Sequence, residues 1–307
     1  MSNSDILRKM YKNDSLVSVV NMSQEGMAMP ANIETWTLDS YGRPTSIELK
    51  SGVTSIPEYW QISNHALSSV TMPGTVVSIG DYAFSDTYLD NIVVPNGCTT
   101  IGNNAFKGCT SLSSIAVPNT VTSIGNNAFS NIGSSNRSAD ISEVDLSNVM
   151  NLRMHCFDSS IIKGNFTISN EQLSGATSGS TSFNYGYSLF SNSRVLSTDT
   201  LNITVYADGR ILPQNIFNFA TYNSKGTVNI TIYGTPTYLS SECFGGTSGC
   251  SVTFVDCVNP PDGNAGTSTS SPFYNFGGTV YVPNSSALSR WKNKYSGYSS
   301  HFKVIGT

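Results

Sequence analysis

The chain has 307 residues, of which 38% are hydrophobic and 12% are charged, and its formal net charge is −4 at pH 7. Binding of nucleic acid through its phosphates requires a basic surface, which this charge balance excludes. The hydrophobic share is sufficient for a core and excludes a disordered chain. No apolar run approaches the roughly 18 residues that span a membrane, so we expect no membrane insertion.

Residues 1–30 have a pattern of their own. Ser4 or Asp5 is the expected N-cap of a short helix, followed by an expected strand over residues 15–20. The apolar residues of that helix would form one stripe: Ile6, Leu7, Met10 and Tyr11. The segment is too short to fold alone, and two roles stay open. It is either an N-terminal cap or a docking segment that binds a protein partner in a larger assembly.

A repeat with a period of 22 or 23 residues follows. Four tetrapeptides ending in isoleucine mark it, at residues 53–56, 76–79, 98–101 and 121–124. An Ala-Phe pair comes shortly after three of them: Ala83-Phe84, Ala105-Phe106 and Ala128-Phe129. Segments that alternate apolar and polar residues and end at proline lie between them, at residues 67–73, 89–95 and 112–118. Alternation predicts short strands, and units this small must stack on their neighbours to form a core.

Weaker copies extend the repeat in both directions. Upstream, Ile33 lies one period before Ile56. Downstream, five pairs occupy the Ala-Phe position: Cys156-Phe157, Leu189-Phe190, Ile216-Phe217, Cys243-Phe244 and Pro272-Phe273. This gives nine or ten units over residues 33–283, with polar insertions at residues 131–140, 174–187 and 260–271. We expect the repeated phenylalanines to stack in one column.

The repeats predict a solenoid with a parallel β ladder on one face and short helical turns and coil on the other, capped at both ends. Residues 101–118, Ile-Gly-Asn-Asn-Ala-Phe-Lys-Gly-Cys-Thr-Ser-Leu-Ser-Ser-Ile-Ala-Val-Pro, resemble the BspA-type leucine-rich repeat of bacterial surface antigens and of some viral and phage proteins. The resemblance implies a curved solenoid used for binding and adhesion rather than catalysis. It is strongest over residues 53–130 and absent from residues 1–30.

We therefore divide the chain into an N-terminal cap or docking segment (1–30), a solenoid (31–283) and a C-terminal cap (284–307). In the last part, Leu288, Trp291 and Tyr295 have helical spacing within residues 286–295, and residues 302–305 form an expected final strand. An open solenoid end exposes core and unpaired strand, so we interpret this helix as a cap rather than as a partner-binding helix.

The cysteines give little sign of metal or redox chemistry. Cys156 and Cys243 occupy the alanine position of the repeat, which predicts small buried core residues. No zinc-binding spacing of Cys or His occurs, and we expect neither a metal nor a cofactor. Cys243, Cys250 and Cys257 are seven residues apart, so a disulfide remains an alternative to free thiols.

Glu143 and Asp145 are the best candidates for acid–base catalysis. On an extended strand their Cα atoms would be about 6.5 Å apart, a separation compatible with glycoside hydrolysis. The sequence predicts no apolar pocket around them, so a solvated pair is the favoured interpretation. We expect that the protein is not an enzyme.

The outward positions of the predicted strands define a candidate binding face. Its residues are Glu143, Asp145, Asn202, Thr204, Tyr206, Asn229, Thr231, Tyr233 and Tyr281. Tyrosine and asparagine are typical of adaptable recognition surfaces. The alternative is a solvated face whose composition reflects strand preference alone.

Abundant small polar residues and few lysines are typical of extracellular proteins, yet the first residues contain no apolar run that would form a secretory signal. A phage particle reconciles the two observations, because lysis releases it. We expect a decoration or host-attachment protein of the virion, anchored through residues 1–30 and contacting a host-surface protein or glycan. A bacterial surface adhesin or antigen is the alternative, and a glycan-active enzyme ranks third.

Overall fold

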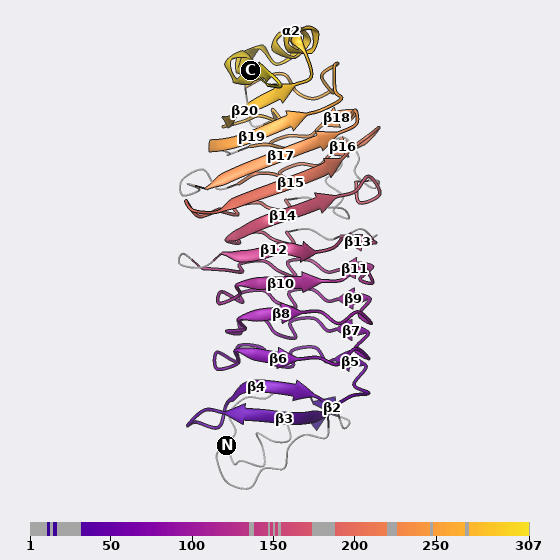
Figure 1. Ribbon diagram of the computed structural model, residues 1–307, viewed down its shortest axis with the longest axis vertical. Coiled ribbons are helices and arrows are strands. Elements are labelled where there is room, and N and C mark those ends of the chain that lie inside the picture. Colours follow the sequence, from indigo (N-terminus) through magenta and orange to yellow (C-terminus); the bar gives the residue numbers. More distant parts are fainter. Residues whose placement is uncertain are drawn as a thin grey trace.

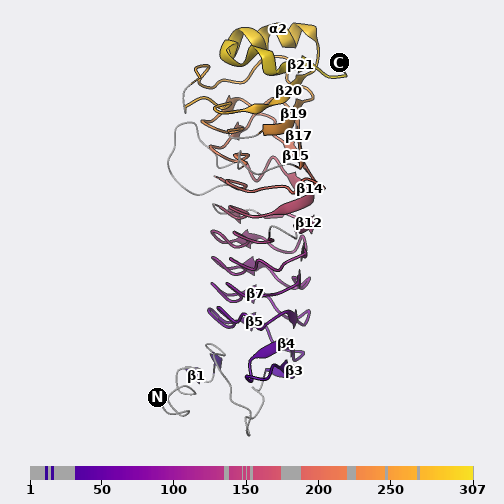
Figure 2. The ribbon, with the colours of Figure 1, turned by 90° about the vertical axis from the view of Figure 1, so that its left-hand side faces the viewer.

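The computed structural model describes residues 11–12, 15–16 and 32–306, apart from residues 135–137, 147, 150, 153–154, 174–187, 220–225, 246–247 and 268–269. The repeats stack along one axis into an elongated solenoid, with the first strands of the stack at one end and the C-terminal helix at the other (Figures 1 and 2). The predicted fold class is confirmed.

One face of the solenoid is a nine-stranded ladder in which every neighbouring pair is parallel. Its strands, in chain order, are β8 (Asn91–Val93), β10 (Ser114–Val117), β12 (Ala139–Val144), β14 (Ile162–Ile168), β15 (Thr200–Tyr206), β17 (Thr227–Tyr233), β19 (Ser248–Phe254), β20 (Gly277–Val282) and β21 (Phe302–Val304). Buried and exposed residues alternate along them, as in Thr200–Tyr206, where Leu201, Ile203 and Val205 face the core.

A second parallel ladder follows the repeated isoleucines on another side of the solenoid (Figure 1). Its strands are β5 (Ser55–Ile56), β7 (Ser78–Ile79), β9 (Thr100–Ile101), β11 (Ser123–Ile124) and β13 (Asn151–Leu152). Further along the chain, β16 (Ile211–Leu212) pairs with β18 (Tyr238–Leu239). The expected helical turns are single tight turns in the described repeats, with a residue of left-handed conformation such as Asn104 or Asn127, both at φ 55°.

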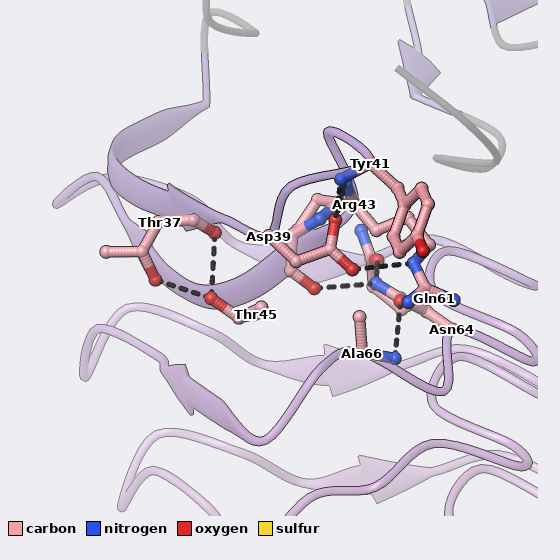
Figure 3. A network of polar contacts seen from close by, with 9 residues as sticks. Thr37, Asp39, Tyr41, Arg43, Thr45, Gln61, Asn64 and Ala66 are labelled. Carbon is pink, nitrogen blue, oxygen red and sulfur yellow. Dashed lines mark hydrogen bonds and ion pairs between the residues drawn. The ribbon is translucent and has the colours of Figure 1, made fainter. Parts of the chain in front are cut away.

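The first strands differ from the expected repeat. β3 (Ile33–Leu38) runs antiparallel to β4 (Pro44–Leu49), which then pairs in parallel with β6 (Ser69–Thr71). Ile33 therefore does not join the ladder of the later isoleucines, because the chain reverses direction after β3. Within the turn, Asp39 Oδ1 accepts hydrogen bonds of 2.9 Å from the backbone N–H groups of Tyr41 and Arg43 (Figure 3). The Arg43 bond lowers the pKa of the Asp39 carboxyl group.

The N-terminal prediction is also corrected in part. Tyr11 lies in β1 (Tyr11–Lys12), which pairs antiparallel with β2 (Ser15–Leu16), and not in a helix. The two residues between these strands, Asn and Asp, are turn formers that favour a tight reversal over a continuous helix. Ile6, Leu7 and Met10 lie outside the described residues.

Phenylalanines from successive units form the expected column through the core. The ring centroids of Phe84 and Phe106, and of Phe106 and Phe129, are 5.3 Å apart, with interplanar angles of 5° and 2°. The column continues through Phe157, Phe190, Phe217, Phe244 and Phe273. Trp60 packs edge-on against Phe84, the first ring of the column, with 5.6 Å between ring centroids.

The C-terminal end of the column is covered as predicted. Helix α2 (Ser285–Lys294) begins after Asn284, whose side chain accepts a 2.9 Å hydrogen bond from the Ala287 N–H. A 3-10 helix η1 (Ser296–His301) leads into β21, which pairs with β20. Trp291 is fully buried, lies 4.6 Å from Phe254 between ring centroids, and donates from Nε1 to the Cys257 carbonyl. The predicted helix and final strand are both confirmed.

Glycine follows the repeated isoleucine because backbones of adjacent units approach closely there. A Cβ on Gly125 would lie 2.5 Å from Asn103 N and 2.6 Å from Gly102 C. We expect Gly125→Ala to lower the free energy of unfolding by about 1–3 kcal/mol, because rigid backbone must move apart. Urea denaturation measures this, with Gly74→Ala as control, since a Cβ there meets nothing within 4 Å. Equal denaturation midpoints for the two variants would contradict the close approach.

Candidate recognition site

The exposed side of the ladder from β12 to β20 carries polar side chains in rows, and we call it the recognition face. The rows arise because strands of equal register bring equivalent residues side by side. The threonine row contains Thr167, Thr204, Thr231 and Thr253 and ends at Tyr281. Tyr281 thus continues the threonine row and is not next to the other predicted tyrosines.

The second row is a ladder of side-chain amides. Asn229 Nδ2 donates to Asn202 Oδ1 at 2.8 Å, and Asn202 Nδ2 donates to Asn165 Oδ1 at 2.9 Å. Ser251 Oγ donates to Asn229 Oδ1 at 2.8 Å and closes the other end. All three bonds point the same way along the solenoid. The ladder therefore ends at Asn165, whose Nδ2 group has no acceptor among the described residues.

The third row consists of two tyrosines. The rings of Tyr206 and Tyr233 stack at 5.4 Å between centroids and 20° between planes. The exposed fractions of Tyr206 and Tyr233 are 47% and 39%. Both rings therefore leave much apolar area in contact with water, which a bound partner could cover. The sequence prediction placed these two residues together correctly as strand neighbours, because Tyr206 and Tyr233 share one register position.

Glu143 and Asp145 lie at the edge of a depression on the same face. Both side chains are exposed, and Glu143 pairs in register with Ala116 after a shift between β10 and β12. The depression has a volume of about 500 Å³ and lies between β12, β14 and β15. Residues of its lining include Glu143, Asp145, Asn165, Thr167, Gln172 and Tyr206.

The depression joins three predicted site residues to three that sequence reasoning did not single out as candidates. Gln172 is buried at its floor, donates from Nε2 to the Leu146 carbonyl and accepts from the Ser169 N–H at 2.7 Å. Asn165 and Thr167 follow the same Asn-x-Thr pattern as residues 202–204 and 229–231. That shared pattern was the signal that could have identified them.

A second depression lies on the earlier strands and was not predicted. Its volume is about 950 Å³, and Tyr88, Asp90, Asn91 and Ser134 contribute to its lining. The exposed Tyr88 ring stacks on His65 at 5.0 Å between centroids. The predicted face residues do not extend to it.

The cysteines take no part in either depression. All six are free and buried, so the alternative of a disulfide among Cys243, Cys250 and Cys257 is not realised. Burial raises the pKa of Cys109 and of Cys250 to about 12, which keeps both as unreactive thiols near neutral pH.

No group of three or more His, Cys, Asp or Glu side chains is arranged to hold a metal ion in the part of the chain that the structure describes. Among these residues there is also no helix with the length and apolarity needed to cross a bilayer.

Part of the repeat region matches a known family model. The family model of the BspA type leucine rich repeat region matches residues 32–163 in six copies. A search of curated proteins finds no match. A leucine rich cell surface protein from Faecalibacterium prausnitzii A2-165 is 17% identical over 80% of this chain and 61% of its own chain, with a TM-score of 0.31. A leucine-rich repeat protein from Bacteroides ovatus ATCC 8483 is 16% identical over 84% of this chain and 77% of its own, with a TM-score of 0.23.

This chain thus spans less than two thirds of the length of the Faecalibacterium protein. The six matched copies lie within residues 32–163, and strands of this part belong to both parallel ladders of the structure. Residues 32–163 of the chain are therefore similar to the BspA type leucine rich repeat region.

Proposed function

We propose that this protein is a non-catalytic recognition scaffold that binds its target through the recognition face. The observation that carries the proposal is the amide ladder beside the exposed tyrosine pair. Side chains fixed in register on a rigid ladder lose little freedom on binding, so a target gains contacts at low entropic cost. Tyrosine adds large contact area to such a surface.

The carboxylates support binding rather than hydrolysis. Paired-carboxylate catalysis relies on an apolar environment around one of the two groups. Glu143 and Asp145 are both exposed, so neither carboxylate is enclosed in an apolar environment. Repeats of this family are generally non-catalytic. If the protein released sugar from a glycan and Glu143→Gln abolished that release, the protein would instead be a glycan-active enzyme.

Cell binding tests the recognition face directly. Fluorescently labelled full-length protein is added to cells of its host bacterium, and bound label is measured by flow cytometry. We expect replacement of Tyr206 and Tyr233 by alanine to reduce bound label about tenfold or more. The control replaces Tyr59 and Tyr82, which stack at 5.1 Å but lie in the turns of the solenoid and not on the recognition face. Equal loss in both double variants would contradict the proposal.

The proposed place of action is a phage particle, to which residues 1–30 attach the solenoid through a protein partner. Ile6, Leu7, Met10 and Tyr11 are the proposed docking residues. Immunogold labelling of purified particles should detect the full chain and not a chain that lacks residues 1–30, with circular dichroism as the check of folding. Unchanged incorporation would contradict the anchoring role. Label at the bacterial envelope in place of particles would make the protein a surface adhesin with the same recognition face.

A further inference from the structure

We propose that the depression between β12, β14 and β15 binds a neutral polysaccharide, with one sugar ring stacked on Tyr206 and sugar hydroxyl groups bonded to Glu143 and Asn165. This inference rests on the proposed recognition function and names the class of its ligand. Three properties of the depression carry it: a missing tyrosine, a mixed set of hydrogen-bonding groups and the negative charge of its lining.

The tyrosine row lacks a member at the depression. The last paired residues of β14 and β15 are Ile168 and Val205, so Ser169, the first residue after β14, follows where Tyr206 follows on β15. Serine leaves open the space that a third ring would fill. Tyr206 stacks on Tyr233 with one face and borders the depression on its other side. A sugar ring in the depression would therefore extend the stack, and the apolar C–H face of a sugar packs well on an aromatic ring.

The polar groups around this position offer both donors and acceptors. The amide ladder ends with Asn165 Nδ2 as a donor, since Asn165 Oδ1 is already used by Asn202. Glu143 is an acceptor that makes no hydrogen bond or ion pair within the described part of the chain. The Thr167 hydroxyl can do either. Sugar hydroxyl groups also donate and accept, so each of these groups finds a partner.

The negative charge of the depression limits the class of ligand further. Glu143 and Asp145 would repel an acidic polysaccharide, and both belong to its lining. A basic peptide would pair with Glu143 and is the competing ligand in the test below. A neutral glycan offers a C–H face to Tyr206, an acceptor to Asn165 and a donor to Glu143 at the same time.

The orientation of the stacked sugar lets a polymer bind through one of its internal units. A ring that continues the tyrosine stack has its glycosidic bonds roughly in the plane of the ring, and these bonds therefore run across the solenoid axis. Glu143 and Asp145 are exposed at the edge of the depression, so the chain can leave it on the open face.

Affinity electrophoresis with the full-length protein tests the inference. Native gels contain one neutral polysaccharide each, namely arabinoxylan, galactomannan, mixed-linkage β-glucan or dextran, and one gel contains the acidic alginate. We expect at least one neutral polymer to retard the protein and alginate not to do so. Tyr206→Ala should weaken the apparent affinity about tenfold, and Tyr59→Ala, which removes an exposed stacked tyrosine elsewhere, should change it less than twofold.

The inference is overturned if no neutral polymer retards the protein, if Tyr206→Ala behaves like the wild type, or if an arginine-rich peptide displaces the bound polymer. The cell-binding assay separates this failure from failure of the recognition function. Loss of binding after periodate oxidation of the cells supports the glycan. Loss only after protease treatment, with the Tyr206 and Tyr233 variant still defective, keeps the recognition face and rejects the glycan. An unimpaired double variant rejects both.

Discussion

Phe106→Ala should lower the free energy of unfolding by about 3–5 kcal/mol, as expected for a fully buried phenylalanine. The Phe106 ring stacks on Phe84 on one side and on Phe129 on the other, at 5.3 Å between centroids in both cases. Its removal therefore weakens two interfaces between units. Each unit of a solenoid is stabilised mainly by its neighbours, and a break in the middle of the column affects both halves. Urea denaturation followed by circular dichroism measures the loss.

Val93→Ala is the matched control for this variant. Val93 lies on β8, in the preceding unit of the stack, but 68% of its surface is exposed. Its replacement should change the free energy of unfolding by about 0.5 kcal/mol or less. A Phe106→Ala protein as stable as the Val93→Ala protein would show that the column does not stabilise the stack.

Trp291→Ala should have an effect of similar size, about 3–5 kcal/mol, but confined to the C-terminal end. The indole ring covers Phe254, and its Nε1 group donates a 3.2 Å hydrogen bond to the Cys257 carbonyl. Without it, helix α2 loses its main buried contact, and β20 and β21 become the exposed end of the ladder. Hydrogen exchange followed by mass spectrometry should show faster exchange in these strands while β8 and β10 keep their protection.

Asn293→Ala serves as the control on the same helix, because Asn293 is exposed and alanine favours helix. Its exchange should match that of the wild type. Uniformly faster exchange along the whole chain in Trp291→Ala would contradict a local cap, and unchanged exchange in β20 and β21 would show that the helix contributes nothing to closing the stack.

The stack and its column could be predicted because each unit repeats the same residues at a fixed distance. Phe84, Phe106 and Phe129 occupy one position of the period, and identical surroundings impose identical packing. The second ladder was missed because strands of two residues, such as Ser78–Ile79, are too short to show alternation. The spacing of Ile33 matched the repeat, but a reversal centred on Gly42, at φ 74°, turns that segment into a hairpin.

The recognition face was predictable only where register is simple. Asn202, Tyr206 and their partners on β17 are side by side because β15 and β17 pair over seven residues without a shift. The depression lies instead where the pairing of β12 with β14 has ended, because only Ala139 and Asp140 of β12 pair with β14. The point at which two strands part results from tertiary pairing and has no signature within either strand. The Asn-x-Thr pattern could therefore identify Asn165 as a face residue, but it could not place Asn165 or Gln172 beside Glu143.

The reversed direction of β3 has a consequence for how copies of the protein can associate. A ladder of parallel strands has two complementary ends, so identical molecules could in principle join top to bottom into a filament, as open head-to-tail contacts do. Among residues 32–306, the first strand runs opposite to its neighbour, and a helix covers the other end. These two ends do not match, which opposes end-to-end stacking of the described part of the solenoid.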